Sequence, residues 1–180
     1  MGSPRVQLRV LTTRDAADLL ELHMRNREYW RRSGPRREDA WFTLDSQRRR
    51  LEDESRDRAD GRALAFGIFA DDRLAGRLTL ANIVRGAFCN AYLGYAVDET
   101  HAGRGIATAA LGPAIDIAFA DGLHRVQAAV SPDNLASRRA LQKVGLRREG
   151  LALRYYLLLD GRWADQELWA ITVEDARPGR

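Results

Sequence analysis

The sequence contains one cysteine, Cys89, one lysine, Lys143, and no long apolar run. A single cysteine excludes an internal disulfide framework, and Cys89 is expected to be a structural thiol in a reducing environment. No stretch reaches the ~20 apolar residues that a membrane-spanning helix needs. Residues 1–5 contain no apolar segment typical of a signal peptide. We therefore expect a cytoplasmic protein that does not associate with membranes.

The charged residues do not form a stripe of one sign. The chain has 29 basic residues, all of them arginines except Lys143, and its formal net charge is +4. Acidic residues are interleaved with the arginines, as in residues 48–54, which predicts a solvated helix face with local ion pairs. No nucleic-acid-binding motif is present, so direct nucleic-acid binding is not expected. A mildly positive field still favours an anionic ligand.

The hydrophobic pattern predicts one mixed α/β domain over residues 1–180. Period-two alternation predicts strands at about 6–11, 63–69, 74–80, 92–97, 125–130, 153–159 and 167–173. Helical spacing predicts a first helix that Thr12 or Thr13 caps and that carries His23 on its apolar face. Three further helices are expected at about 38–58, 105–120 and 134–144. No internal repeat or low-complexity segment is visible.

A glycine-rich segment, residues 97–108, joins a predicted strand directly to a predicted helix. Gly103 and Gly105 let the backbone adopt conformations closed to other residues and let a ligand approach closely. The helix N-terminus offers free N–H groups that suit a pyrophosphate. The same spacing opens dinucleotide-binding folds, but here the loop follows an antiparallel meander and no acidic residue ends the next strand. The remaining alternative is that the glycines only allow a tight turn into the helix and that the loop binds no ligand.

Two downstream motifs give this loop a context. Residues 131–141 read Ser-Pro-Asp-Asn-Leu-Ala-Ser-Arg-Arg-Ala-Leu, and residues 144–150 read Val-Gly-Leu-Arg-Arg-Glu-Gly. In this order the motifs resemble the GNAT superfamily of N-acetyltransferases, with Leu146 in place of the usual phenylalanine. Residues 156–165 resemble the C-terminal signature of the ribosomal-protein-alanine N-acetyltransferase group within that superfamily.

This resemblance implies a mostly antiparallel central sheet in which two parallel strands, 92–97 and 125–130, splay apart, flanked by about four helices. Acetyl-CoA would lie between these strands and no metal would be needed. The acetyl-CoA-binding core would span about 92–150, and the acceptor-side helices about 13–58. The implied cofactor-binding residues are Ala96, Val97, Gly103, Arg104, Gly105, Ile106, Ala107, Asn134 and Ser137. Further candidates for contacts to the nucleotide phosphates are Arg138, Arg139 and Lys143.

The resemblance also implies direct acetyl transfer, without a covalent enzyme intermediate. The backbone N–H of Val97 would stabilise the oxyanion. Many GNAT enzymes carry a tyrosine on the helix after the asparagine, but the matching residue here is Leu141, so Ser137 is the candidate to protonate or stabilise the leaving thiolate. No general base is assigned: Glu149 is expected to be structural, and the remaining candidates are Glu99, His101 and Glu167.

The expected acceptor is the N-terminal α-amine of a protein, such as a ribosomal protein, that begins with Ala or Ser. Aromatic residues that could wall its site are Tyr29, Trp30, Trp41, Phe42, Tyr155 and Tyr156. One alternative keeps the enzyme class but takes a small amine, such as an aminoglycoside, polyamine or amino acid. Another is a catalytically weak CoA-binding regulatory module, which the loss of the tyrosine at Leu141 favours. Both a monomer and a homodimer are compatible with the sequence.

Overall fold

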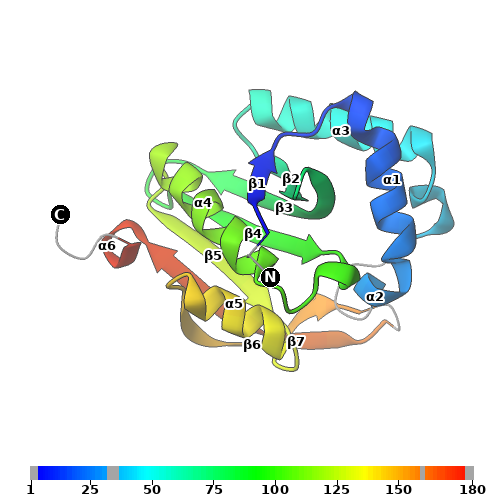
Figure 1. Ribbon diagram of the computed structural model, residues 1–180. Coiled ribbons are helices and arrows are strands. Elements are labelled where there is room, and N and C mark those ends of the chain that lie inside the picture. Colours follow the sequence, from blue (N-terminus) through cyan, green and yellow to red (C-terminus); the bar gives the residue numbers. More distant parts are fainter. Residues whose placement is uncertain (1–3, 32–36, 159–160, 177–180) are drawn as a thin grey trace.

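The computed structural model describes residues 4–31, 37–158 and 161–176, and its centre is one seven-stranded sheet. Across the sheet the order is β1-β2-β3-β4-β5-β7-β6 (Figure 1). The strands are β1 (Val6–Arg9), β2 (Leu64–Ala70), β3 (Arg73–Val84), β4 (Asn90–Val97), β5 (Arg125–Val130), β6 (Arg147–Leu157) and β7 (Trp163–Thr172). Neighbouring strands are antiparallel except β4 and β5. The predicted mixed α/β, mostly antiparallel fold is confirmed.

Four longer helices match the four that the sequence predicts, and two short ones are added. The helices are α1 (Ala16–Arg25), α2 (Arg27–Arg31), α3 (Leu44–Ala59), α4 (Ile106–Ala120), α5 (Leu135–Lys143) and α6 (Val173–Ala176). The predicted start of the second helix at about residue 38 is wrong. Thr43 caps α3, since its side chain accepts the N–H of Ser46, and residues 39–41 form a separate 3-10 turn.

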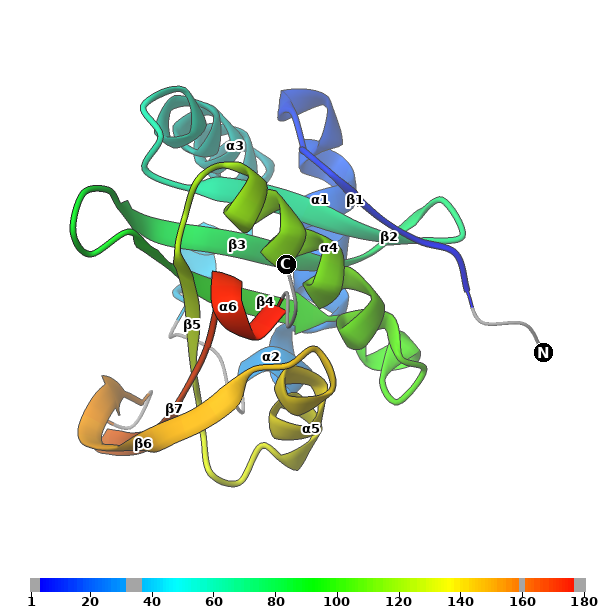
Figure 2. The same cartoon turned by 90° about the vertical axis from the view of Figure 1, so that its left-hand side faces the viewer.

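Two hydrophobic cores cover the two faces of the sheet. The larger core lies between the sheet and α4 and α5, with Ala110, Leu111 and Leu141 fully buried. The smaller core lies under α1 and α3, around Leu19 and Leu51. Figure 2 shows α4 on one side of the sheet with α1 and α3 on the other. No helix within the described ranges is long and apolar enough to cross a membrane.

The parallel strands β4 and β5 pair only over their first residues. Asn90 lies opposite Arg125, and the pairing ends where Tyr92 lies opposite Gln127. Beyond that point β4 stays paired with β3 as far as Val97, whereas β5 stays paired with β7. The two strands therefore splay apart toward their C-terminal ends, as the sequence predicts.

One carboxylate on α3 accepts hydrogen bonds from two arginines. The Glu54 carboxylate accepts Arg77 Nη2 at 2.5 and 2.6 Å and Arg50 Nε at 2.8 Å. The Arg77 side chain, which comes from β3, is only 6% exposed. The predicted solvated face of this helix holds for Arg48 and Asp53, which are exposed. It is wrong for Arg50 and Glu54, because the helix turns them toward the buried Arg77.

Replacement of the shared carboxylate is expected to be costly. Glu54→Gln leaves Arg77 buried without a counter-ion, so the free energy of unfolding should fall by roughly 3–5 kcal/mol. Urea denaturation of the purified variant measures this change. The matched control is Asp53→Asn on the same helix, whose side chain is 62% exposed and which should stay within about 0.5 kcal/mol of the parent. Equal losses in the two variants would contradict a structural role for the Glu54 carboxylate.

Candidate active site

The end of β4 directs unpaired backbone groups toward the diverging β5. The N–H of Asp98 donates to the carbonyl of Ala75 on β3 at 2.8 Å. In an antiparallel ladder such pairs alternate, so the backbone groups of Ala96 also face β3. Those of Tyr95 and Val97 face the other way, where β5 has parted from β4. Of the two predicted backbone partners for the cofactor arm, Val97 thus faces the divergence and Ala96 does not.

A tryptophan from α2 contacts this strand end. Trp30 Nε1 donates to the carbonyl oxygen of Val97 at 2.9 Å. That oxygen points away from β3, which agrees with the direction that the ladder assigns to Val97. The Val97 N–H lies on the same edge of the strand and has no strand opposite it. The geometry is therefore compatible with the predicted oxyanion donor.

Helix α1 holds the first residues after β4. The Asp98 carboxylate accepts Arg25 Nε at 2.6 Å and the N–H of Thr100 at 3.0 Å. Burial alone would raise the pKa of Asp98, but the bonds from Arg25 and Thr100 keep it below its usual value. The Glu99 N–H donates to Asn26 Oδ1 at 2.8 Å, and Asn26 is fully buried. The loop that leads to α4 is thus fixed at its start.

The glycine loop has the backbone shape that the sequence predicts. Gly103 and Gly105 have φ angles of 74° and 79°, in the left-handed region where residues with a Cβ are strained. Gly105 is the N-cap of α4, and no side chain of the described chain caps this helix. The first-turn N–H groups, among them those of Ile106 and Ala107, therefore have no intrahelical partner. Such a terminus attracts an anion.

Ser137 faces a tyrosine that the sequence reading missed. Its N–H donates to Asn134 Oδ1 at 3.1 Å, so the Asn134 side chain caps α5. The hydroxyls of Ser137 and Tyr95 lie 2.7 Å apart, which links α5 to β4 beyond the point of divergence. Burial raises the pKa of Tyr95, so its hydroxyl stays protonated at neutral pH. Leu141, at the position of the superfamily's tyrosine, is fully buried in the larger core.

Glu167, one of the base candidates, and Glu149, whose expected role is structural, are both held in ion pairs. Glu167 is buried, and its carboxylate lies 2.9 Å from Arg138 Nε and 2.9 Å from Arg148 Nε. Hydrogen bonds from Arg125 lower the pKa of Glu149, which agrees with its predicted structural role. A carboxylate held in this way is a poor proton acceptor. No general base emerges from either glutamate.

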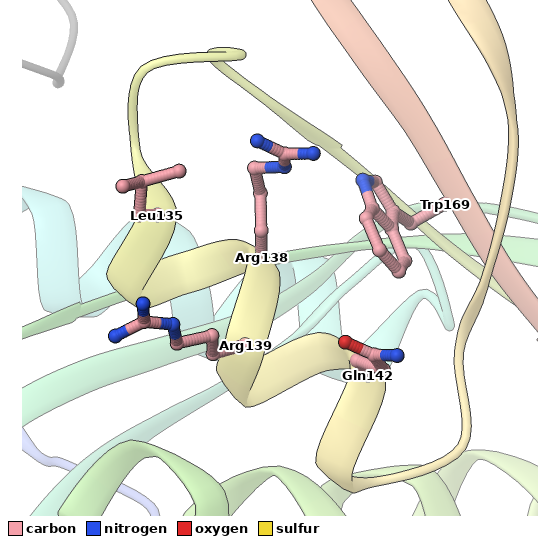
Figure 3. Close-up of a pocket in the computed structure, with 5 residues that line it drawn as sticks. All are labelled: Leu135, Arg138, Arg139, Gln142 and Trp169. Carbon is pink, nitrogen blue, oxygen red and sulfur yellow. The ribbon is translucent and has the colours of Figure 1, made fainter.

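A pocket of about 220 Å³ lies between α5 and β7. It is lined by Leu135, Arg138, Arg139, Gln142 and Trp169, and Figure 3 shows the three polar side chains projecting from α5. Arg138, a candidate phosphate contact, pairs with Glu167 and also donates to the carbonyl of Pro132. Its charge is therefore already balanced within the protein, whereas Arg139 is exposed.

The model of the family described as "Acetyltransferase (GNAT) domain" matches residues 5–147, which include both diverging strands and the glycine loop. The chain belongs to the GNAT acetyltransferase family. It is an acetyl-CoA-dependent N-acetyltransferase, as the motif order predicts. Within the described ranges, no group of three or more histidine, cysteine, aspartate or glutamate side chains is placed to hold a metal ion.

Several GNAT proteins resemble this chain over nearly its whole length. The probable N-acetyltransferase YjcK of Bacillus subtilis (strain 168) is 37% identical over 173 residues, which are 94% of this chain and 95% of that protein. The ribosomal protein uS5-alanine N-acetyltransferase of Escherichia coli (strain K12) is 33% identical over 183 residues, covering 100% and 94%. The structure of Mycobacterium smegmatis RimJ in complex with CoA-disulfide is 36% identical, with a TM-score of 0.90, covering 96% and 87%.

His23 of this GNAT protein lies at the centre of an aromatic group beside Trp30. Its ring packs edge-on against the rings of Trp30 and Trp41, at centroid distances of 5.4 and 5.9 Å. Arg50 Nη1 lies 3.1 Å from His23 Nε2. Burial, with the nearby charges of Arg50 and Arg77, lowers the pKa of His23 to about 3. His23 is therefore neutral at physiological pH and too weak a base to accept the proton of an amine.

The neutral His23 predicts a loss of stability in acid. The unfolded chain binds a proton at His23 below pH 6.5, whereas the folded protein does not do so until about pH 3. The free energy of unfolding should therefore decrease as the pH falls through this window, by at most about 1.4 kcal/mol per pH unit. His23→Gln removes this titration and should flatten the decrease between pH 6.5 and 4.5 in urea denaturation. An unchanged slope would rule out the buried neutral imidazole.

Proposed function

We propose that this GNAT enzyme acetylates the N-terminal α-amine of a protein that begins with Ala or Ser. The observation that carries this proposal is the parting of β4 and β5, which leaves the Val97 N–H without a strand opposite it, on the strand edge that Trp30 contacts. Similarity over the full chain to the uS5-alanine enzyme of E. coli supports a protein N-terminus as the acceptor. A ribosomal protein is the acceptor class that this similarity favours.

The donor would bind along β4 as if it were an added strand. The backbone groups of Tyr95 that face β5 would pair with an amide of the pantetheine arm, and the Val97 N–H on the same edge would lie at its thioester end. Asn134, at the start of α5, would lie beside the arm. The pyrophosphate would accept N–H groups of the glycine loop, residues 103–107. The left-handed glycines and the uncapped start of α4 fit an anion of this kind.

The reaction needs the residues at the divergence to stabilise charge that develops in the transition state. As the amine attacks the thioester carbonyl, a C–N bond forms and the carbonyl oxygen gains negative charge, which the Val97 N–H would stabilise. When the C–S bond breaks, the hydroxyl pair of Tyr95 and Ser137 would donate a hydrogen bond or a proton to the thiolate. The α-amine, with a pKa near ~8, is partly neutral already and can lose its proton to water.

The hydroxyl pair is tested by removing each hydroxyl in turn. Ser137→Ala and Tyr95→Phe should each lower kcat by about 10- to 100-fold and leave acetyl-CoA affinity nearly unchanged, because the interaction is made in the transition state. The double variant should lose little more than either single one, since the two hydroxyls act as one unit. Ser55→Ala on α3, an exposed serine, is the control. Full turnover in both single variants would leave the pair with a packing role only.

The acceptor is tested with peptides and small amines side by side. Peptides that begin with Ala or Ser should be acetylated on the α-amine, whereas peptides with a bulky first residue should react at least tenfold more slowly. A bulky side chain displaces the amine, and misplacement by ~1 Å can cost a hundredfold in rate. Mass spectrometry separates α-amine from lysine acetylation. If polyamines or aminoglycosides react much faster than every Ala-led peptide, the small-molecule alternative replaces this proposal.

A further inference from the structure

Two arginines lie over the Trp41 ring, and a third shares a carboxylate with one of them. The guanidinium carbon of Arg37 lies 3.9 Å from the centroid of the Trp41 ring, and that of Arg50 lies 4.8 Å from it. Arg77 shares the Glu54 carboxylate with Arg50. We call Arg37, Arg50 and Arg77 the arginine cluster.

The arginine cluster carries more positive charge than its surroundings balance. Among the described residues, Glu54 is the carboxylate that is hydrogen-bonded to it, and His23 beside it is neutral. Arg37 pairs with no acid within the described chain; its contact is the face of Trp41. Burial, followed by the charge of Arg77, lowers the pKa of Arg50 to about 10. The three guanidinium groups thus have one hydrogen-bonded carboxylate among them, and it contacts Arg50 and Arg77 but not Arg37.

The same region has unpaired donors. Arg77 Nε, Arg77 Nη1 and Trp41 Nε1 are buried and have no hydrogen-bond partner within the described structure. All three atoms are donors, and a guanidinium cannot accept a hydrogen bond. Arg77 is more than nine-tenths buried, so its charge acts through a medium that screens it less than water does. The region therefore favours an anion at the exposed Arg37.

The arginine cluster lies next to the proposed point of acetyl transfer. Trp30 bonds the Val97 carbonyl at 2.9 Å, and its ring packs on His23, whose Nε2 lies 3.1 Å from Arg50. On the sheet, Arg77 is the direct partner of Ala96 on β4. The positive charge of Arg37 also opposes the rise in pKa that burial causes at Tyr156 of β6. The cluster therefore lies on the acceptor side, between α3 and the β6 strand.

We propose that the arginine cluster binds a carboxylate of the acceptor, supplied by an Asp or Glu side chain shortly after the acetylated residue. This proposal rests on the proposed function, because it requires a peptide acceptor. An extended peptide advances about 3.4 Å per residue, so acidic side chains at the second, third and fourth positions would reach successively farther from the acetylated amine toward the cluster. Arg37 provides the exposed contact, whereas Arg50 and Arg77 provide the field behind it.

The proposal is tested with matched Ala-led peptides that carry Glu, Gln or Lys at positions two, three or four. At one of these positions, Glu should exceed Gln by about tenfold in kcat/KM, chiefly through a lower KM, and Lys should be poorest. The preference should shrink as the salt concentration rises. Arg37→Glu should abolish the preference for Glu and favour the Lys peptide, while Arg37→Gln should make the enzyme indifferent to charge.

Arg49→Glu is the matched control, because Arg49 is an exposed arginine on α3 that has no contact with Trp41. It makes the same charge change and should keep the preference for Glu. The inference alone is wrong if Ala-led peptides are acetylated at rates that ignore their charge, or if Arg37→Glu and Arg49→Glu behave alike. If no peptide is acetylated and small amines are, the proposed function is wrong and this inference falls with it. Thermal unfolding of each variant confirms that it is folded.

Discussion

The parting of two parallel strands is the constraint on which the site depends. A parallel pair normally satisfies its backbone groups along its full length, but β4 and β5 stop pairing at Tyr92 and Gln127. Each strand is held in place by its other neighbour, so the divergence does not unravel the sheet. It leaves the edge of β4 at Tyr95 and Val97 free to bind a ligand by its backbone. The open edge of the proposed donor site is thus produced by sheet topology.

The two faces of the sheet carry different parts of the proposed site. The Tyr95 side chain points to the face of α4 and α5, where it meets Ser137, and the glycine loop opens α4 on that face. The Arg77 side chain points to the face of α1 and α3, where it meets Glu54. The alternation of side chains along neighbouring strands separates the two environments by one layer of backbone. The proposed thiolate chemistry and the proposed acceptor recognition thus lie on opposite sides of the same strands.

Local patterns in the sequence were sufficient for most of the fold. The alternation predicted the strands and the glycines at 103 and 105 predicted the loop, because these features depend on residues close together in the chain. The splayed pair was implied by the resemblance of the motifs to the GNAT superfamily, since it involves two strands that a helix separates in the chain. The partner of Ser137 could not be predicted, since Tyr95 is 42 residues away and meets it only after α5 has packed on the sheet. The burial of Arg50 and Glu54 likewise depends on Arg77, a residue of another element. A pattern of charged residues in the sequence predicts a solvated helix face only where no buried charged residue of another element packs against it.

Three hydrogen bonds make the junction between the acceptor-side helices and the end of β4 a rigid joint. Arg25 holds Asp98, Asn26 holds Glu99, and Trp30 holds Val97. These donors and acceptors lie within six consecutive residues, 25–30, on one side and three, 97–99, on the other, so a hinge at this junction would break all three bonds together. We therefore expect β4 and the helices of the proposed acceptor side to move as one body. Substrates are expected to meet in a preformed arrangement, and any opening needed for product release must come from elements outside this joint, such as the β6–β7 hairpin.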